Sequence, residues 1–337
     1  MKALTLSVVI PTFNRAASLR ATLDGLARQD YAGAWEAVVV SDGSTDDTGQ
    51  VVREYAAPYP LRLLEQANGG PARARNRGVA EAAGEVIVFT DDDVEPSPGF
   101  VGRHAAHHEN VGNLAVIGPM LPDPTRREPV WIAWEHAMLA KQYDAWRTGE
   151  WAGVGPHHFY SGNASVRRDH LLAVRGFDEN YGRQEDVELA GRLEAECGVA
   201  FRYDAAAVGT HRPLRTWEGW LKVPFAYGAL DVARARADGG RTFERVTHGY
   251  RARNRATRLL ADLCLRRPAA GVRVRAALLA AATSLYAAGR RGAALSALSA
   301  IYNVRYLEGA ADALGTASLL RLLAAPGTVP ATRKAVS

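Results

Sequence analysis

The sequence predicts an α/β protein with an open, largely parallel sheet and a helical C-terminal extension. Three observations support this class. Short apolar runs alternate with helical segments over residues 4–100, a polar turn follows each apolar run, and the chain becomes rich in Ala, Leu and Arg beyond about residue 250. Such alternation is typical of parallel sheets flanked by helices. With 337 residues, 47% of them hydrophobic, the chain can form one large domain or two modest ones.

Four strands are predicted from the apolar runs at 4–10, 35–42, 61–66 and 85–93. Between the first two, Leu19, Leu23 and Leu26 recur at helical spacing and predict a helix over 16–29. A second helix follows "GSTDDT", where Ser44 or Thr45 is the expected N-cap.

A third helix follows "NGG", with Pro71 near its first turn and Gly84 just past its end. The polar sets "TFNR", "SDG", "NGG" and "TDDD" all lie at strand ends. Ligands of such sheets bind beyond the carboxyl ends of the strands, so these turns predict one shared site.

Residues 100–160 carry a weaker pattern. Four of the seven tryptophans fall between Trp131 and Trp151, which fits an acceptor cleft or a subunit contact. "HAAHH" (104–108) fits a metal site, but we expect it on a surface helix. Helical patterns return over 171–200, with Gly198 as the expected C-cap.

Beyond residue 250 we expect helices broken near Pro268 and at Gly289 and Gly292. The longest uncharged stretch there, 276–289, is shorter than the roughly 20 residues that a spanning helix needs, so none is predicted.

Charge divides the chain into an acidic front and a basic tail. Residues 241–337 carry 16 Lys and Arg against 4 Asp and Glu, a net of +12, whereas residues 1–240 carry 25 against 32, a net of −7. We therefore expect two regions with different roles, one over 1–240 and a helical region over 241–337. Two unpatterned cysteines and an N-terminus without a cleavage site favour a cytoplasmic protein.

Three consecutive carboxylates, Asp91, Asp92 and Asp93, end the fourth strand. Asp91 and Asp93 point to the same side of an extended segment, where their charges would repel unless a cation is bound. Mg²⁺ typically takes one or two protein carboxylates together with waters and substrate phosphates. An isolated "DDD" is more often a solvated turn, but its place after an α/β strand favours a metal site. Glu185 and Asp186, in "QEDVELAGRL", lie in a first helical turn, which by itself favours carboxylates.

Four ordered blocks resemble glycosyltransferase family 2: "VVIPTFNRAASLRATLDGL", "VVVSDGSTDDT", "NGGPARARNRGVAEAAGEVIVFTDDD" and "SGNASVRRDHLLAVRGFDENYGRQEDVELAGRL". The resemblance covers about residues 5–212, and it implies a catalytic domain over 1–240 with a nucleotide-binding half (1–100) and an acceptor half (101–240). It implies the GT-A fold, a Rossmann-like sheet flanked by helices, and an inverting, nucleotide-sugar-dependent enzyme that uses Mn²⁺ or Mg²⁺.

The resemblance also implies the roles of individual residues. The nucleotide pocket would begin with Pro11, Thr12, Phe13, Asn14 and Arg15. Asp42 would accept a hydrogen bond from the base, Arg75 would line the nucleotide-sugar site, and Asp92 would lie in the cofactor site.

Asp93 would bind the metal directly, Asp91 would contact the ribose or the metal's waters, and His211 is a further candidate ligand. Asp186 would be the general base, and Glu185 would orient the acceptor. Asn163 would contact the donor sugar.

The basic tail leaves three interpretations open. It lies on an anionic membrane surface, docks on the acidic front, or binds nucleic acid, which is the least favoured because no nucleic-acid motif is present. The first would place the protein peripherally at the inner face of the membrane, where a lipid-linked acceptor would be reached.

We therefore predict a metal-dependent glycosyltransferase of cell-envelope or polysaccharide biosynthesis. It would move a sugar from a nucleotide-diphosphate donor to a hydroxyl of a glycan, lipid-linked or small-molecule acceptor. The alternatives are a nucleotidyltransferase and a non-catalytic nucleotide-sugar-binding scaffold.

Overall fold

The computed structural model describes residues 4–151 and 153–325, which form two compact units. Unit 1 contains the described residues up to Arg127 together with Glu135–Leu214. Unit 2 contains Glu128–Trp134 and the described residues from Arg215 onwards. The boundary between the units lies near residue 215, before the predicted boundary at residue 240. The reason is that helix α8 (Trp217–Ala237) packs against helix α12 (Arg291–Leu314) of unit 2. Which residues complete the catalytic region stays a prediction.

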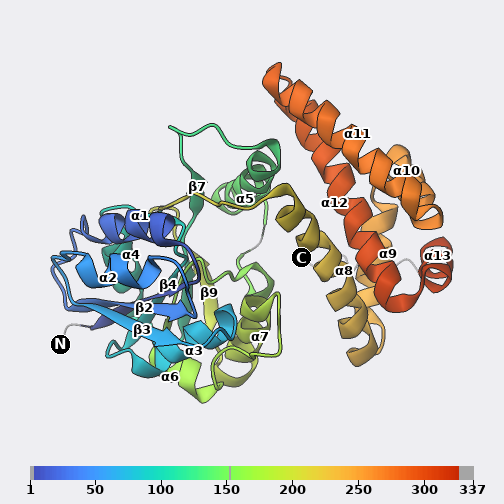
Figure 1. Cartoon of the computed structure of the whole chain (residues 1–337). Helices are drawn as coiled ribbons and strands as arrows, with labels where there is room; N and C mark the ends of the chain where they lie inside the picture. Colours follow the sequence, from blue (N-terminus) through green and yellow to red (C-terminus); the bar gives the residue numbers. More distant parts are fainter. Residues whose placement is uncertain (1–3, 152, 326–337) are drawn as a thin grey trace. The chain divides into compact units, whose positions relative to one another are not determined.

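The main sheet of unit 1 has seven strands, and its mixed, mostly parallel order confirms the predicted class (Figure 1). In sheet order the strands are β3 (Leu61–Gln66), β2 (Trp35–Asp42), β1 (Leu6–Thr12), β4 (Val86–Thr90), β8 (Asn163–Arg167), β6 (Leu114–Ile117) and β9 (Ala200–Tyr203). Strands β3, β2, β1 and β4 are parallel, and β8 runs antiparallel to both of its neighbours.

Two apolar cores cover the two faces of this sheet, because successive side chains of a strand point to opposite faces. Val8 of β1 belongs to the core that also contains residues of α1 (Ala16–Leu26), α2 (Thr48–Glu54) and α4 (Phe100–His108). Its neighbour Val9 belongs to the core with α3 (Pro71–Glu81), α6 (Arg168–Ala173) and α7 (Glu185–Cys197). Figure 1 shows these two helical layers.

A small second sheet joins segments that are far apart in the sequence. Its order is β5 (Val94–Pro96), β10 (Gly209–His211) and β7 (Met120–Pro122). In this register His211 pairs with Val94, and the Arg212 N–H donates to the Asp93 carbonyl (2.7 Å). The register therefore places the end of β10 beside the three aspartates.

Several predicted element ends are confirmed, and others are wrong. Gly198 ends α7 with a φ of 65°, as expected of a C-cap glycine. Helix α2 begins at Thr48 after Asp47, so neither Ser44 nor Thr45 is its N-cap. The weakly patterned middle region contains α5 (Val130–Thr148) and the short helix η1 (Pro156–His158).

Unit 2 is helical over its described residues. Besides α8 and α12 it contains α9 (Arg241–Arg251), α10 (Arg255–Arg266), α11 (Pro268–Ala287) and α13 (Thr316–Ala324). The breaks predicted near Pro268 and at Gly289 are confirmed, whereas Gly292 lies inside α12.

Helices α8 and α12 approach closely at two glycines. A Cβ on Gly228 would lie 1.9 Å from the Tyr306 carbonyl oxygen, and one on Gly309 would lie 1.8 Å from that of Phe225. None of the helices among the described residues is long and apolar enough to cross a membrane.

Candidate active site

The three aspartates after β4 lie in three different environments. Asp92 is buried, and its Oδ2 accepts a hydrogen bond from Thr12 Oγ1 at the end of β1 (2.7 Å). Burial raises the pKa of Asp92 to about 7, and the charge of Asp93 adds to this effect. Asp91 is the more accessible of the other two. Asp92 therefore fixes the turn to β1, and its neighbours supply the carboxylates.

Asp93 faces cationic and imidazole groups. Its Oδ2 lies 3.4 Å from Arg15 Nη1, and its Oδ1 lies 3.6 Å from His211 Nε2. The other ring nitrogen of His211, Nδ1, lies 3.1 Å from His136 Nε2. If Nδ1 of His211 carries the proton, its Nε2 lone pair is directed toward Asp93, as in a metal-ligating histidine held by a second residue.

The donor set around Asp93 fits a divalent cation that completes its shell on a substrate. Among residues 4–151 and 153–325 no three His, Cys, Asp or Glu side chains form a metal cage. Asp93 nevertheless supplies the carboxylate oxygens that Mn²⁺ and Mg²⁺ prefer, and Asp91 lies in the same turn. His211 adds an imidazole nitrogen, a ligand of transition metals that favours Mn²⁺ over Mg²⁺. Mg²⁺ usually keeps several waters and binds phosphates, so two protein ligands are sufficient.

Arg75 of α3 joins the acidic turn to helix α7. Its side chain is only 7% exposed, and its two terminal nitrogens contact Asp91 Oδ1 (2.7 Å) and Glu185 Oε1 (3.3 Å). Burial acts to lower the pKa of Arg75, but the charges of Asp91, Glu185 and Asp186 outweigh it and raise the pKa. Two segments far apart in sequence thus share one buried cation.

Asp186 lies in the first turn of α7, after Gln184 in a left-handed conformation (φ 59°). Its Oδ1 accepts from the Val187 N–H (2.9 Å), and its carboxylate also accepts from the Ser161 N–H. Burial raises the pKa of Asp186 to about 6, with a further contribution from the charge of Glu185. A carboxylate with such a pKa is ionised at neutral pH and is more basic than an ordinary aspartate.

The predicted nucleotide pocket lies among turns that are joined to one another by hydrogen bonds. Asn14 (φ 53°) accepts through Oδ1 from the Thr45 N–H (2.7 Å), which joins the "PTFNR" turn to the loop after β2. Pro11 is buried within β1, whereas Phe13 is largely exposed.

Asp42 is buried at the end of β2. Its Oδ1 accepts from Gln66 (2.7 Å) and the Gly69 N–H (2.9 Å), and its Oδ2 accepts from the Gly70 N–H (2.8 Å). This carboxylate therefore holds the "NGG" turn, a role that the predicted base contact did not include.

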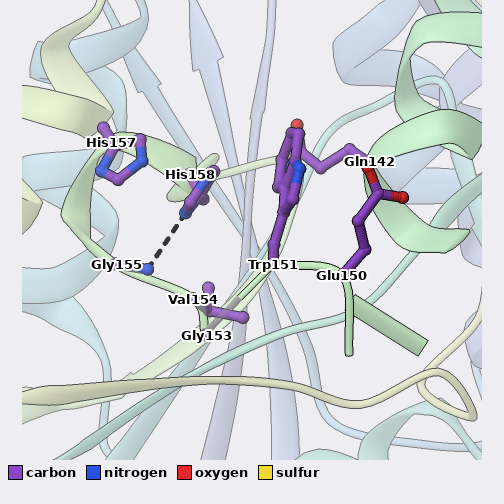
Figure 2. Close-up of a pocket in the computed structure, with 8 residues that line it drawn as sticks. All are labelled: Gln142, Glu150, Trp151, Gly153, Val154, Gly155, His157 and His158. Carbon is purple, nitrogen blue, oxygen red and sulfur yellow. Dashed lines mark hydrogen bonds between the residues drawn. The ribbon is translucent and has the colours of Figure 1, made fainter. Parts of the chain in front are cut away.

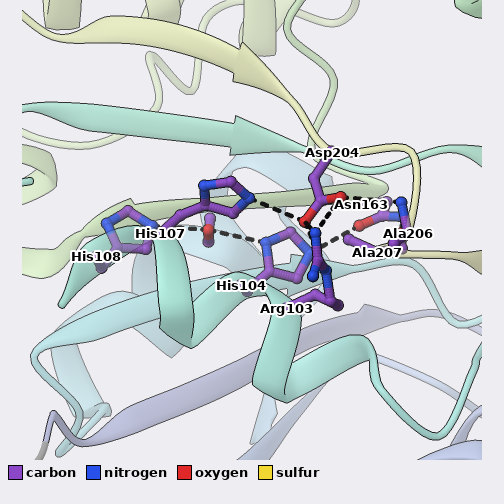
Figure 3. A network of polar contacts seen from close by, with 9 residues as sticks. Arg103, His104, His107, His108, Asn163, Asp204, Ala206 and Ala207 are labelled. Atoms are coloured by element: carbon purple, nitrogen blue, oxygen red, sulfur yellow. Dashed lines mark hydrogen bonds and ion pairs between the residues drawn. The ribbon is translucent and has the colours of Figure 1, made fainter. Parts of the chain in front are cut away.

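Asn163 lies in a buried network (Figure 3). Its amide Nδ2 donates to the carbonyls of Pro119 (2.9 Å) and Ala207 (2.8 Å). Its Oδ1 is 2.9 Å from His104 Nε2, so this nitrogen of His104 carries the proton. Because the amide is fully used inside the protein, the geometry gives no support to the predicted sugar contact.

The same network corrects the prediction for "HAAHH". His104 and His108 of α4 are fully buried, and both contact Ser165 Oγ (2.9 and 2.8 Å). Burial lowers the pKa of His104 to about 4 and that of His108 to about 3. They are neutral core residues, whereas we had placed them on a surface helix.

The structure thus brings together Arg15, Asp91, Asp93, His211, Arg75, Glu185 and Asp186. Sequence reasoning missed His136 and Ser161, whose only signal was proximity created by the fold. The Cβ position of Gly162 lies 2.8 Å from Asp91 Oδ2, so this glycine leaves room for the Asp91 carboxylate.

The comparisons with known proteins agree with this arrangement. Residues 7–172 match the model of the family described as "Glycosyl transferase family 2". The chain is 32% identical over 234 residues to the validoxylamine A glucosyltransferase of Streptomyces hygroscopicus subsp. jinggangensis, which covers 62% of this chain and 55% of that protein. It is 27% identical over 234 residues to the glucosyl-dolichyl phosphate glucuronosyltransferase of Haloferax volcanii, over 64% of this chain and 72% of that protein.

Among solved structures, the mannosyltransferase PcManGT of Pyrobaculum calidifontis in complex with GDP-Man and Mn²⁺ has a TM-score of 0.57 and 25% identity, over 91% of this chain and 86% of that one. The chain spans only part of the curated relatives that it matches. For three of them, the aligned region covers 27%, 55% and 51% of the relative's length. The sheet and flanking helices of unit 1 are those of the GT-A glycosyltransferases, and residues 7–172 form a domain of glycosyltransferase family 2.

Proposed function

We propose that this chain is an inverting, metal-dependent glycosyltransferase that moves a hexosyl or related group from a nucleotide-diphosphate donor to an acceptor hydroxyl. The observation that carries the proposal is the Arg75 bridge between Asp91 (2.7 Å) and Glu185 (3.3 Å). It joins the donor-side acidic turn to the helix that begins with Glu185 and Asp186. Nucleotide-sugar transfer requires both groups in one site.

Asp186 is the general base of this mechanism. It takes the proton of the acceptor hydroxyl as that oxygen forms a bond to the anomeric carbon. The bond from this carbon to the donor phosphate oxygen breaks, and its electron pair leaves on the nucleoside diphosphate. The pKa of about 6 leaves Asp186 ionised and basic at neutral pH. A single displacement of this kind inverts the anomeric configuration.

Asp93 and His211 would hold the divalent cation, with Asp91 next to it. When bound, Mn²⁺ or Mg²⁺ supplies charge stabilisation for the leaving diphosphate. Arg15, which lies 3.4 Å from Asp93, adds a fixed positive charge on the same side. The mannosyltransferase PcManGT was solved with GDP-Man and Mn²⁺, which supports a similar donor and metal class here.

The family 2 domain disfavours the nucleotidyltransferase alternative, whereas the scaffold alternative is separated by experiment. Calorimetric titration with UDP, GDP and dTDP, with and without Mn²⁺, should show metal-dependent binding of one nucleotide, lost in Asp93→Ala. Binding without turnover of any sugar nucleotide would favour the scaffold. Failure of a folded protein to bind any nucleotide would overturn the proposed function.

The basic surface of unit 2 supports a peripheral place at the inner face of the membrane, with a lipid-linked acceptor within reach. Leu259 (72% exposed) and Leu263 lie one turn apart on α10, and Val272 of α11 is 60% exposed. Residues 251–307 contain eleven arginines and one acidic residue, Asp262, which pairs with Arg266 (2.9 Å). A surface of exposed leucines among arginines favours binding to an anionic lipid surface. A second molecule of this chain would instead bring arginines against arginines.

Flotation with vesicles tests this membrane proposal. The protein should float with vesicles containing 30 mol% phosphatidylglycerol and stay behind with phosphatidylcholine alone. Leu259→Asp combined with Leu263→Asp should abolish flotation, whereas Leu172→Asp, at an exposed leucine of unit 1, should not. Equal flotation of both variants would reject the α10–α11 surface.

A further inference from the structure

A recess of about 850 Å³ lies in unit 1 between the C-terminal end of α5 and helix η1 (Figure 2). Its lining comes from Gln142 of α5, from Glu150 and Trp151, and from the segment that ends with His157 and His158. The mechanism above assigns none of these residues a role. The recess is also large enough for a ligand, since small-molecule sites usually have about 300–1,000 Å³.

An aromatic wall forms one side of the recess. The ring of Trp151 stacks on that of His158, with centroids 5.6 Å apart and an interplanar angle of 25°. Trp146 supports both rings from behind with edge contacts of 6.3 Å to Trp151 and 5.1 Å to His158. Trp151 is nevertheless 38% exposed, so part of its indole is available to a ligand. A large side chain fixed by two neighbours and still exposed is typical of a binding platform.

The polar groups that line the recess beside this wall include His158, Gln142 and Glu150. His158 Nδ1 accepts from the Gly155 N–H (3.1 Å), so any ring proton lies on Nε2, which can donate to a ligand. Burial lowers the pKa of His158 to about 4, and the charge of neighbouring His157 acts in the same direction. Gln142 offers both a donor and an acceptor, and Glu150 offers acceptors. The lining residues include no Lys or Arg.

These groups define the chemistry of the ligand. An apolar ring face would lie on Trp151, and hydroxyls would bind the amide, carboxylate and imidazole groups. A phosphate or carboxylate would meet the Glu150 carboxylate and no Lys or Arg, which costs free energy. The recess therefore fits a neutral ring that carries several hydroxyls, such as a saccharide or a cyclitol.

The chain connects this recess to the general base. Helix η1 packs against α7, and the Ser161 N–H donates to the Asp186 carboxylate. Two residues separate His158 from Ser161, so their backbones are at most about 10 Å apart. One short segment thus carries both a ring of the aromatic wall and the N–H that binds Asp186.

We propose that this recess, with Trp151 as its platform, binds the acceptor as a neutral polyhydroxylated ring. The inference rests on the proposed function, of which it names the acceptor class. It assigns Trp146 and Trp151 to an acceptor cleft, whereas Trp131 and Trp134 of the predicted aromatic cluster pack against Trp217 and Trp220 in a separate apolar core.

Tryptophan fluorescence of the full chain tests the proposal directly. Cellobiose, maltose, lactose and myo-inositol, each titrated in the presence of Mn²⁺ and the nucleotide that binds, should include at least one ligand that shifts the emission. Trp151→Phe should weaken that ligand at least tenfold and leave nucleotide affinity unchanged. Leu172→Ala, an exposed leucine outside the recess, is the matched control and should behave as the unmodified protein.

Glu150→Lys provides a second variant that keeps the aromatic wall. It should raise the affinity for glucose 6-phosphate relative to glucose at least fivefold, because it places a cation in the recess. The proposal is overturned if no neutral ring shifts the emission of a protein that binds nucleotide, or if the shift survives Trp151→Phe unchanged. Loss of nucleotide binding in the unmodified protein would instead reject the proposed function itself.

Discussion

Two polar clusters in unit 1 differ in the charge of their groups. The first contains ionised groups, because the buried guanidinium of Arg75 lies among the carboxylates of Asp91, Glu185 and Asp186. The second joins His104 and Asn163 to Ser165, and its groups are neutral and hydrogen-bonded. A neutral network with satisfied amide groups mainly fixes the fold, whereas buried charges with displaced pKa values mark a site prepared for chemistry.

The two clusters also respond to pH with opposite sign. In the folded state the pKa of Asp186 in the first cluster is about 6, and that of Asp92 in the adjoining acidic turn is about 7, whereas the ordinary value is 3.8. The folded state therefore binds more protons than the unfolded state between about pH 4 and 7, and the free energy of unfolding falls as pH rises over this range. The pKa values of His104 (about 4) and His108 (about 3) lie below 6.5, so their contribution is lost as pH falls below that value.

Asp186→Asn should give the largest effect on activity. The amide cannot accept the hydroxyl proton, so transfer should fall about 10²–10⁴-fold while nucleotide affinity is retained. The thermal midpoint at pH 8 should rise, because a buried carboxylate with a raised pKa is removed. Steady-state kinetics and calorimetry measure both effects. Asp144→Asn, at an exposed surface carboxylate, is the control, and undiminished transfer in Asp186→Asn would remove this residue from its role.

Arg75→Ala should give the largest loss of stability. Without the guanidinium, Asp91 and Glu185 lose their shared cation, and removal of one partner from a buried ion pair costs about 3–5 kcal/mol. Arg75→Lys should recover part of this free energy, since it keeps the charge and loses the planar fork. Urea unfolding measures both variants.

Arg73→Ala provides the matched control on the same helix, because Arg73 is exposed and Arg75 is buried. Equal unfolding free energies for Arg73→Ala and Arg75→Ala would show that the bridge carries no net stability. The buried ion pairs of Arg75 would then contribute no more to stability than an exposed arginine does.

The sequence predicted the charged cluster better than the neutral one, for a physical reason. Apolar runs and their period determine the parallel strands, and the strand ends must then gather Thr12, Asp42 and Asp91 at one edge. The pairing of Asp93 with His211 depends instead on β5 and β10, which are three residues long and carry no hydrophobic pattern. Family resemblance supplied that pairing, and the residues alone did not.

Asn163, His104 and Asp42 show what a one-dimensional pattern leaves out. The family resemblance implies that Asn163 contacts the donor sugar, and the sequence predicts His104 on a surface helix, but both side chains are buried. In the structure they bind each other 59 positions apart. The resemblance likewise implies that Asp42 binds the base, which stays a prediction, and in the structure both of its oxygens also hold the "NGG" turn. Polar residues that satisfy one another within the fold look like ligand-binding residues until their partners are known.

Asn163→Ala should test the neutral cluster by leaving buried groups without partners. The Pro119 and Ala207 carbonyls and the His104 N–H would lose their hydrogen bonds, and the expected loss of stability is about 1–3 kcal/mol. Nucleotide affinity in the refolded protein should change little. Asn180→Ala, in an exposed turn, is the control. A large fall in donor affinity without loss of stability would return Asn163 to the sugar-binding role.

Asp92→Asn should give the smallest change in thermal stability. The sign of this change shows whether Asp92 belongs with the charged cluster around Arg75 or with the neutral, hydrogen-bonded one. Asp92 is buried against Thr12, and its raised pKa means that ionisation near neutral pH costs the folded state free energy. In the absence of divalent metal the variant should therefore melt about 2–4 °C higher at pH 8, with little difference at pH 4, where both side chains are neutral. If the thermal midpoint falls at both values of pH, the Thr12 hydrogen bond to a carboxylate is what matters, and Asp92 belongs with the satisfied, structural network. A gain confined to high pH would instead place Asp92 with Asp186, among the carboxylates that the fold keeps at a cost because the site needs their charge.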